Sequence, residues 1–152
     1  MLIIRPEQFE KLSQAVDRRF EARLGGWLRE HFAVELDALP PEDPRLASTS
    51  AVDRDAAFVK LSVARAEKYG IEESRDVAVF VALILANLRF RQAGSGQLLD
   101  GLRRLLDRRD ADGPSKIALV LHELKRLACS DERLRWLAGA LVDAHEGAAW
   151  KI

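Results

Sequence analysis

Apolar residues recur three or four positions apart along most of the chain, which is the spacing of one face of an α-helix. The first such stripe predicts an amphipathic helix from about Pro6 to Phe32. Gly25 and Gly26 lie inside this run, and each glycine costs a helix interior about 1 kcal/mol relative to alanine. We therefore expect a kink there, with close approach of a neighbouring helix favoured over a hinge as its reason.

The middle of the chain predicts a loop followed by two helices. Residues 35–49 are rich in acidic residues and proline, which is typical of a surface connection. The sequence Ser50–Asp53 resembles a capping box that opens a second helix, and Gly70 can take the left-handed conformation that closes it. A third helix should begin near Ser74. Its middle, Val77–Ala86, is apolar on every face and is the expected centre of the core.

The C-terminal third predicts three shorter helices. Residues 92–97 indicate a linker before a leucine-rich fourth helix, and Asp112–Pro114 combines a turn with the start of a fifth. Ser130 is the expected cap of the sixth. No alternating run bounded by hairpin turns occurs. The sequence therefore predicts an all-α bundle of about six helices in one domain spanning residues 1–152, without a fixed-period repeat.

The charge balance and the apolar runs limit the classes of partner and compartment. The chain has 152 residues, with 24 Lys and Arg against 24 Asp and Glu. This balance gives no electrostatic reason to expect a nucleic-acid or membrane partner. The longest apolar run, ten residues, falls short of the about 20 that span a membrane, and Met1–Pro6 is too short for the apolar core of an export signal. With Cys129 as the single cysteine, we expect a reducing, cytoplasmic location.

No motif for catalysis or metal binding is found. The three histidines, His31, His122 and His145, fall on three different predicted helices, and none belongs to a His-Glu-x-x-His or Glu-x-x-His unit. Glu30 and Glu35 would support general acid–base chemistry only if the fold brought another carboxylate to them. No phosphate-binding loop, dinucleotide motif or Gly-x-Ser-x-Gly elbow occurs. We therefore expect no catalytic residue, metal or cofactor.

Four residues are candidates for binding a protein. Trp136 lies about 180° from the middle of the apolar stripe of the last helix, so it should be exposed or meet a second surface. Tryptophan is enriched at interface hot spots, and Trp150 could join it. Packing of Trp136 on the N-terminal segment or the tail is the alternative. Arg104 and Arg108 share one predicted helix face, where a contact with an anion, a nucleic acid or a protein partner competes with simple solvation.

Residues 66–83 resemble a signature of small bacterial proteins encoded beside the spike, tip and toxin genes of type VI secretion systems. An Ala-x-x-Tyr-Gly-Ile helix end, here Ala66–Ile71, precedes an Asp-Val-x-x-Phe-Val helix start, here Asp76–Val81. The opening Ile4–Phe9 is also similar, so the resemblance covers residues 3–90.

The resemblance implies a cytoplasmic accessory protein with a secreted effector or a spike or tip component as its partner. It would act as an effector adaptor or chaperone, or as an immunity protein that blocks a toxin. Two other classes stay open. One is a small helical enzyme with converging histidines and carboxylates, and the other is a nucleic-acid-binding regulator.

Overall fold

The computed structural model describes residues 6–38, 51–92 and 100–146, with side chains from residue 18 in the first range and from residue 54 in the second. This part of the chain contains seven α-helices and one short 3-10 helix, and it contains no strand, so the all-α prediction is confirmed. The α-helices are α1 (Pro6–His31), α2 (Ala33–Asp37), α3 (Ala51–Lys68), α4 (Ser74–Gln92), α5 (Asp100–Leu106), α6 (Gly113–Ala128) and α7 (Arg135–His145).

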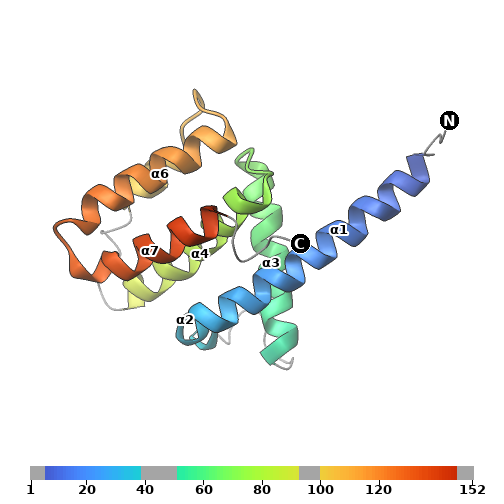
Figure 1. Cartoon of the computed structure of the whole chain (residues 1–152), viewed down its shortest axis with the longest axis horizontal. Helices are drawn as coiled ribbons and strands as arrows, with labels where there is room; N and C mark the ends of the chain where they lie inside the picture. The colour runs from blue at the N-terminus through green and yellow to red at the C-terminus, as the bar shows by residue number, and fades with distance from the viewer. Residues whose placement is uncertain (1–5, 39–50, 93–99, 147–152) are drawn as a thin grey trace.

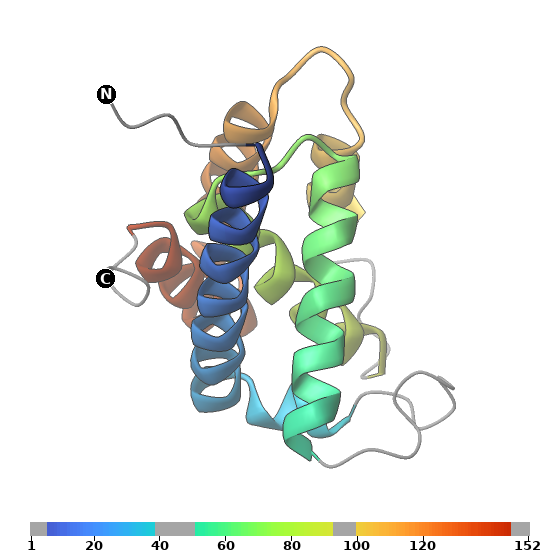
Figure 2. The same cartoon turned by 90° about the vertical axis from the view of Figure 1, so that its right-hand side faces the viewer.

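Helix α4 lies at the centre of the core, as its apolar middle predicts. Residues 77–83 are all buried, and α4 packs against α1, α3, α6 and α7. Figure 1 shows α6 and α7 on one side of α4 and α1 and α3 on the other, and Figure 2 shows α1 and α3 side by side. The N-terminal half of α1 projects beyond the other helices (Figure 1). None of the described helices combines the length and the apolar character that crossing a membrane requires.

The turn from α3 to α4 is a Schellman motif. Gly70 has a φ of 78°, a conformation that side chains other than glycine rarely adopt. The N–H of Ile71 donates to the carbonyl of Ala66 at 3.0 Å, and that of Gly70 donates to Glu67 at 3.0 Å. Ile71 is fully buried against the end of α3. The predicted helix stop at Gly70 is therefore confirmed.

The first turn of α6 docks onto this Schellman turn. A Cβ atom on Gly113 would overlap the carbonyl group of Gly70 and would lie 3.0 Å from the Cα of Ile71. Lys116, also buried, donates from Nζ to the carbonyl of Tyr69 at 3.1 Å. That contact satisfies a carbonyl at the end of α3, so the two helix ends hold each other in place.

Arg29 ties the end of α1 to two other helices. Its Nε and Nη2 donate to both carboxylate oxygens of Asp55 in α3, at 2.8 and 2.7 Å, and its Nη1 donates to Asp37 in α2 at 2.7 Å. These hydrogen bonds raise the pKa of Arg29 above its ordinary value. The guanidinium of Arg29 thereby fixes the position of α2 relative to α1 and α3.

The expected reason for Gly25 and Gly26 in α1, close approach of a neighbouring helix, was wrong. The helix runs through Gly25 and Gly26 without interruption. A Cβ on Gly25 would lie 3.8 Å from the side chain of Val59 in α3, an ordinary contact, and a Cβ on Gly26 would meet nothing within 4 Å. Close approach of a neighbouring helix therefore does not require either glycine.

The sequence predicted a surface loop at residues 35–49. The first part of this prediction was wrong, because residues 35–37 belong to α2 (Ala33–Asp37). Residues 39–49 lie outside the described residues, as does the predicted linker 92–97 apart from Gln92.

The starts of the last two helices agree with the sequence in one case only. The helix start predicted at Asp112–Pro114 is confirmed, and Asp112 caps α6 by accepting from the N–H of Ser115 at 2.8 Å. Before α7, a 3-10 helix spans Glu132–Leu134 and its cap is Asp131, whereas the Ser130 hydroxyl bonds a carbonyl of α6. Ser130 as the cap was therefore wrong, because its hydroxyl completes the preceding helix.

Candidate functional site

Trp136 projects from the outer side of α7, opposite the residues that this helix buries. The tryptophan is 40% exposed, and its ring centroid lies 5.6 Å from that of Phe32 at the junction of α1 and α2. The guanidinium carbon of Arg89, near the end of α4, lies 5.7 Å from the Trp136 ring centroid. Trp136 is thus partly exposed and also packs on the N-terminal helices. We call Trp136, Phe32 and Arg89 the Trp136 cluster.

A buried carboxylate fixes Arg89 in this cluster. The Nη1 of Arg89 lies 2.6 Å from Oε1 of Glu35, whose side chain is only 3% exposed. The sequence placed Glu35 in a surface connection, and that interpretation was wrong because α2 directs it inward. Glu30 is exposed, and Glu35 faces an arginine, so the two do not form a carboxylate pair with each other. A buried carboxylate needs such a partner, because its desolvation is otherwise uncompensated.

The three histidines have different surroundings. His31 is exposed, and its ring centroid lies 5.1 Å from that of Trp27. His122 is exposed on α6, whereas His145 is half-buried at the end of α7. Among the residues with described side chains, no group of three histidines, cysteines or acidic residues is placed to hold a metal ion.

His145 lies beside Asp76, a carboxylate in the first turn of α4 that is 1% exposed. The Nε2 of His145 is 3.2 Å from Oδ1, yet neither oxygen of Asp76 has a hydrogen-bond partner in the described part of the chain. Burial raises the pKa of Asp76 and the nearby Glu73 adds to this, while His145 and Arg75 oppose it. The pair joins the start of α4 to the end of α7, but it does not line the cleft described next.

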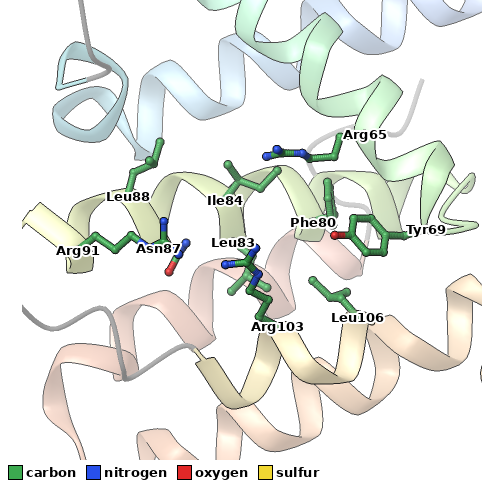
Figure 3. A pocket seen from close by; sticks show the side chains of 10 residues that line it. All are labelled: Arg65, Tyr69, Phe80, Leu83, Ile84, Asn87, Leu88, Arg91, Arg103 and Leu106. Carbon is green, nitrogen blue, oxygen red and sulfur yellow. The ribbon is translucent and has the colours of Figure 1, made fainter. Parts of the chain in front are cut away.

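A cleft of about 240 Å³ opens between α3, α4 and α5 (Figure 3). Its apolar residues include Phe80, Leu83 and Ile84 of α4. Each of the three helices contributes one arginine to the lining. These arginines are Arg65 from α3, Arg91 from α4 and Arg103 from α5. The other lining residues are Tyr69, Asn87, Leu88 and Leu106.

Sequence reasoning missed this cleft. Arg65 has the pattern of an outer helix face and Arg91 that of a helix end, and each is unremarkable alone. The available signal was that Phe80, Ile84, Asn87 and Arg91 follow one another at helical spacing, which places a polar pair beside apolar residues. The partners from α3 and α5 come together only through the packing.

The other predicted binding residues lie elsewhere. Arg104 is exposed on α5, which packs on α6. Arg108 is not on that helix, because α5 ends at Leu106, and its guanidinium instead bonds Asp110 at 2.9 and 2.6 Å. This contact lowers the pKa of Asp110. The predicted shared helix face of Arg104 and Arg108 was therefore wrong, and Trp150 lies outside the described residues.

Comparison of the chain with protein-family models, with curated proteins and with solved structures gives no match.

Proposed function

We propose that this protein is a non-catalytic protein-interaction module whose partner contacts the Trp136 cluster. The observation that carries the proposal is a tryptophan that is 40% exposed while its ring rests on Phe32 and beneath Arg89. Tryptophan and arginine are the residue types most enriched at interface hot spots. A partner that covers Trp136 would bury its remaining exposed surface without first having to order it.

The contacts beneath Trp136 support this role. Arg89 is held by the ion pair to the buried Glu35, and Phe32 is fully buried at the end of α1. The ring of Trp136 therefore packs on side chains that are themselves held by contacts among α1, α2 and α4. A preorganised side chain loses less conformational entropy on binding, and this favours affinity.

For the biological setting, the resemblance of residues 66–83 favours a cytoplasmic accessory protein of a type VI secretion system. Its partner would be a secreted effector or a spike or tip component. An adaptor or chaperone would bind a loading segment and leave a toxin active, whereas an immunity protein would abolish the toxin's activity. The support for this setting is the sequence signature alone.

A pull-down with paired variants tests the proposal. The bait is the full chain, presented to a lysate that expresses the neighbouring genes, at moderate and high salt, with mass spectrometry as the readout. Trp136→Ala is the test variant. Leu61→Ala is the matched control, because Leu61 is a similarly exposed apolar residue, at 38%, on α3. Circular dichroism establishes that both variants are folded.

We expect a stoichiometric partner that survives high salt, is retained by Leu61→Ala and is lost by Trp136→Ala. Assaying the activity of that partner in the complex then separates an adaptor from an immunity protein. Equal retention by the two variants would contradict the role of Trp136. Recovery of a metal, a metabolite or salt-labile nucleic acid in place of a protein would favour the enzyme or the regulator.

A further inference from the structure

The cleft between α3, α4 and α5 concentrates positive charge that the described residues do not neutralise. Arg65, Arg91 and Arg103 line it, and no aspartate or glutamate does. None of the three makes an ion pair with a carboxylate in the described part of the chain. By contrast, ion pairs with carboxylates are made by Arg29, Arg75, Arg89, Arg108, Arg126, Arg133 and Arg135.

The arrangement of these arginines suits an anionic group. Figure 3 shows Arg65 and Arg103 reaching over the lining residues of α4 from opposite sides, with Asn87 and Arg91 further along that helix. A guanidinium presents a planar fork of donors that matches a carboxylate. The side-chain amide of Asn87 adds donors and an acceptor beside them.

The apolar residues of the cleft require a second kind of contact. Phe80 and Leu83 are buried, but Ile84 and Leu88 are partly exposed in the cleft, so a ligand that only carried charge would leave this apolar surface in water. Small-molecule pockets usually hold about 300–1,000 Å³, whereas this open cleft holds about 240 Å³. That volume suits one apolar side chain of a larger partner better than a whole small molecule.

We propose that this cleft binds an acidic segment of a partner protein, with one apolar side chain on Ile84 and Leu88 and flanking carboxylates on Arg65, Arg91 and Arg103. The inference rests on the proposed function in that the acidic segment belongs to a protein. The cleft is nevertheless separate from the Trp136 cluster. At 100° per residue, Arg89 lies about 180° around α4 from Phe80 and about 160° from Asn87.

An acidic peptide fits the cleft better than a nucleic acid does. The whole chain has a formal net charge of zero, so it does not attract polyanions at long range. Nucleic-acid recognition relies on phosphate contacts, which the three arginines could supply, and on stacking of bases. Of the two aromatic residues in the lining, Phe80 is buried and Tyr69 already packs against Phe80 and Lys116. An apolar side chain beside a carboxylate uses both parts of the site.

The test is a selection of random twelve-residue peptides displayed on phage against the full-length protein. The affinity of the recovered peptides is then measured by fluorescence anisotropy. Arg103→Ala is the test variant and Arg104→Ala is the matched control, because it removes the same charge at the neighbouring exposed position of α5. Arg65→Ala and Arg91→Ala probe the other two helices, and thermal unfolding shows whether each variant is folded.

We expect recovered peptides in which aspartate or glutamate flanks a leucine, isoleucine or phenylalanine. Loss of one charge-assisted contact should weaken binding about fivefold or more in Arg103→Ala, and Arg104→Ala should stay within about twofold of the wild type. Binding should also weaken as the salt concentration rises.

Four results would overturn the proposal. They are recovery of no binding peptide, recovery of peptides without acidic residues, equal affinity of the Arg103→Ala and Arg104→Ala variants, and tight binding of a single-stranded oligothymidylate that the same arginine variants lose. Trp136→Ala should bind the peptides like the wild type. Failure at the cleft can therefore be told apart from failure at the Trp136 cluster.

Discussion

Glu35 and Asp76 are both buried carboxylates, but their surroundings differ. Glu35 faces the guanidinium of Arg89 at 2.6 Å, whereas both oxygens of Asp76 lack a hydrogen-bond partner among the described residues. The ion pair with Arg89 compensates the cost of burying the carboxylate of Glu35. Asp76 lies in the first turn of α4 and has only His145 beside it. The two residues therefore predict opposite responses to substitution.

Asp76→Asn should not destabilise the protein at neutral pH. Burial raises the folded-state pKa of Asp76 above its ordinary value of 3.8. The contribution of Asp76 to the free energy of unfolding is therefore fully present below pH 3.8, where the carboxyl is protonated. It is lost as the pH rises through the raised folded-state pKa. We expect Asp76→Asn to be at least as stable as the wild type at pH 7, with this advantage shrinking as the pH falls toward 3.8.

Urea unfolding between pH 4 and pH 7 measures this difference. The control is Asp143→Asn, an exposed acid on α7, which should change stability by less than about 0.5 kcal/mol at any pH. An Asp76→Asn variant that is less stable than the wild type at pH 7 and matches it in acid would show that the carboxylate is stabilised in the fold.

Arg89→Ala should destabilise the protein by about 1–3 kcal/mol, because it leaves the buried carboxylate of Glu35 without a partner. The exposed Arg91, on the same last turn of α4, provides the control, and Arg91→Ala should stay within about 0.5 kcal/mol of the wild type. Removing Glu35 as well should recover part of the loss. Equal stability of Arg89→Ala and Arg91→Ala in chemical denaturation would contradict the role of the ion pair.

At the scale of elements, the contact between α6 and the α3–α4 turn depends on Gly113. Gly113→Ala should destabilise the protein by about 1–3 kcal/mol, because its Cβ would overlap the carbonyl of Gly70. Gly139→Ala is the control, since a Cβ at this exposed position of α7 meets nothing within 4 Å. It should stabilise the helix by about 0.5–1 kcal/mol. Thermal unfolding distinguishes the two, and a stabilised Gly113→Ala would rule out the close contact.

The helices that the sequence predicts well are those whose ends carry a local signal. Gly70 ends α3, Asp112 caps α6 and the apolar run of α4 fixes its burial, because each feature depends on residues a few positions apart. The five-residue α2 was not predicted, since it is too short for a periodic stripe. Its inward orientation depends on the distant contacts of Glu35 and Arg29, which periodicity cannot reveal.

The two candidate sites also differ in how far local sequence determines them. The outward position of Trp136 follows from the periodicity of its own helix, so sequence reasoning found it. The cleft needs one arginine from each of three helices, and its assembly depends on tertiary packing. Arg108 was misplaced because the prediction extended α5 beyond Leu106, and helix ends are the least reliable part of such predictions.

At the scale of the whole molecule, α4 joins the N-terminal and C-terminal helices into one core. Unfolding should therefore be a single cooperative transition. Tryptophan fluorescence, which includes the buried Trp27 of α1 and Trp136 of α7, should give the same urea midpoint as far-ultraviolet circular dichroism. Two separated midpoints would show that the N-terminal and C-terminal helices unfold independently.

The central claim is that a protein partner covers the Trp136 cluster. It is tested most directly by isothermal titration calorimetry of the recovered partner against the wild type, Trp136→Ala and Leu61→Ala. A hot-spot tryptophan contributes about 2 kcal/mol or more, so Trp136→Ala should weaken the Kd by about 30-fold or more while Leu61→Ala stays within about twofold. The same Kd for Trp136→Ala and the wild type would contradict the account.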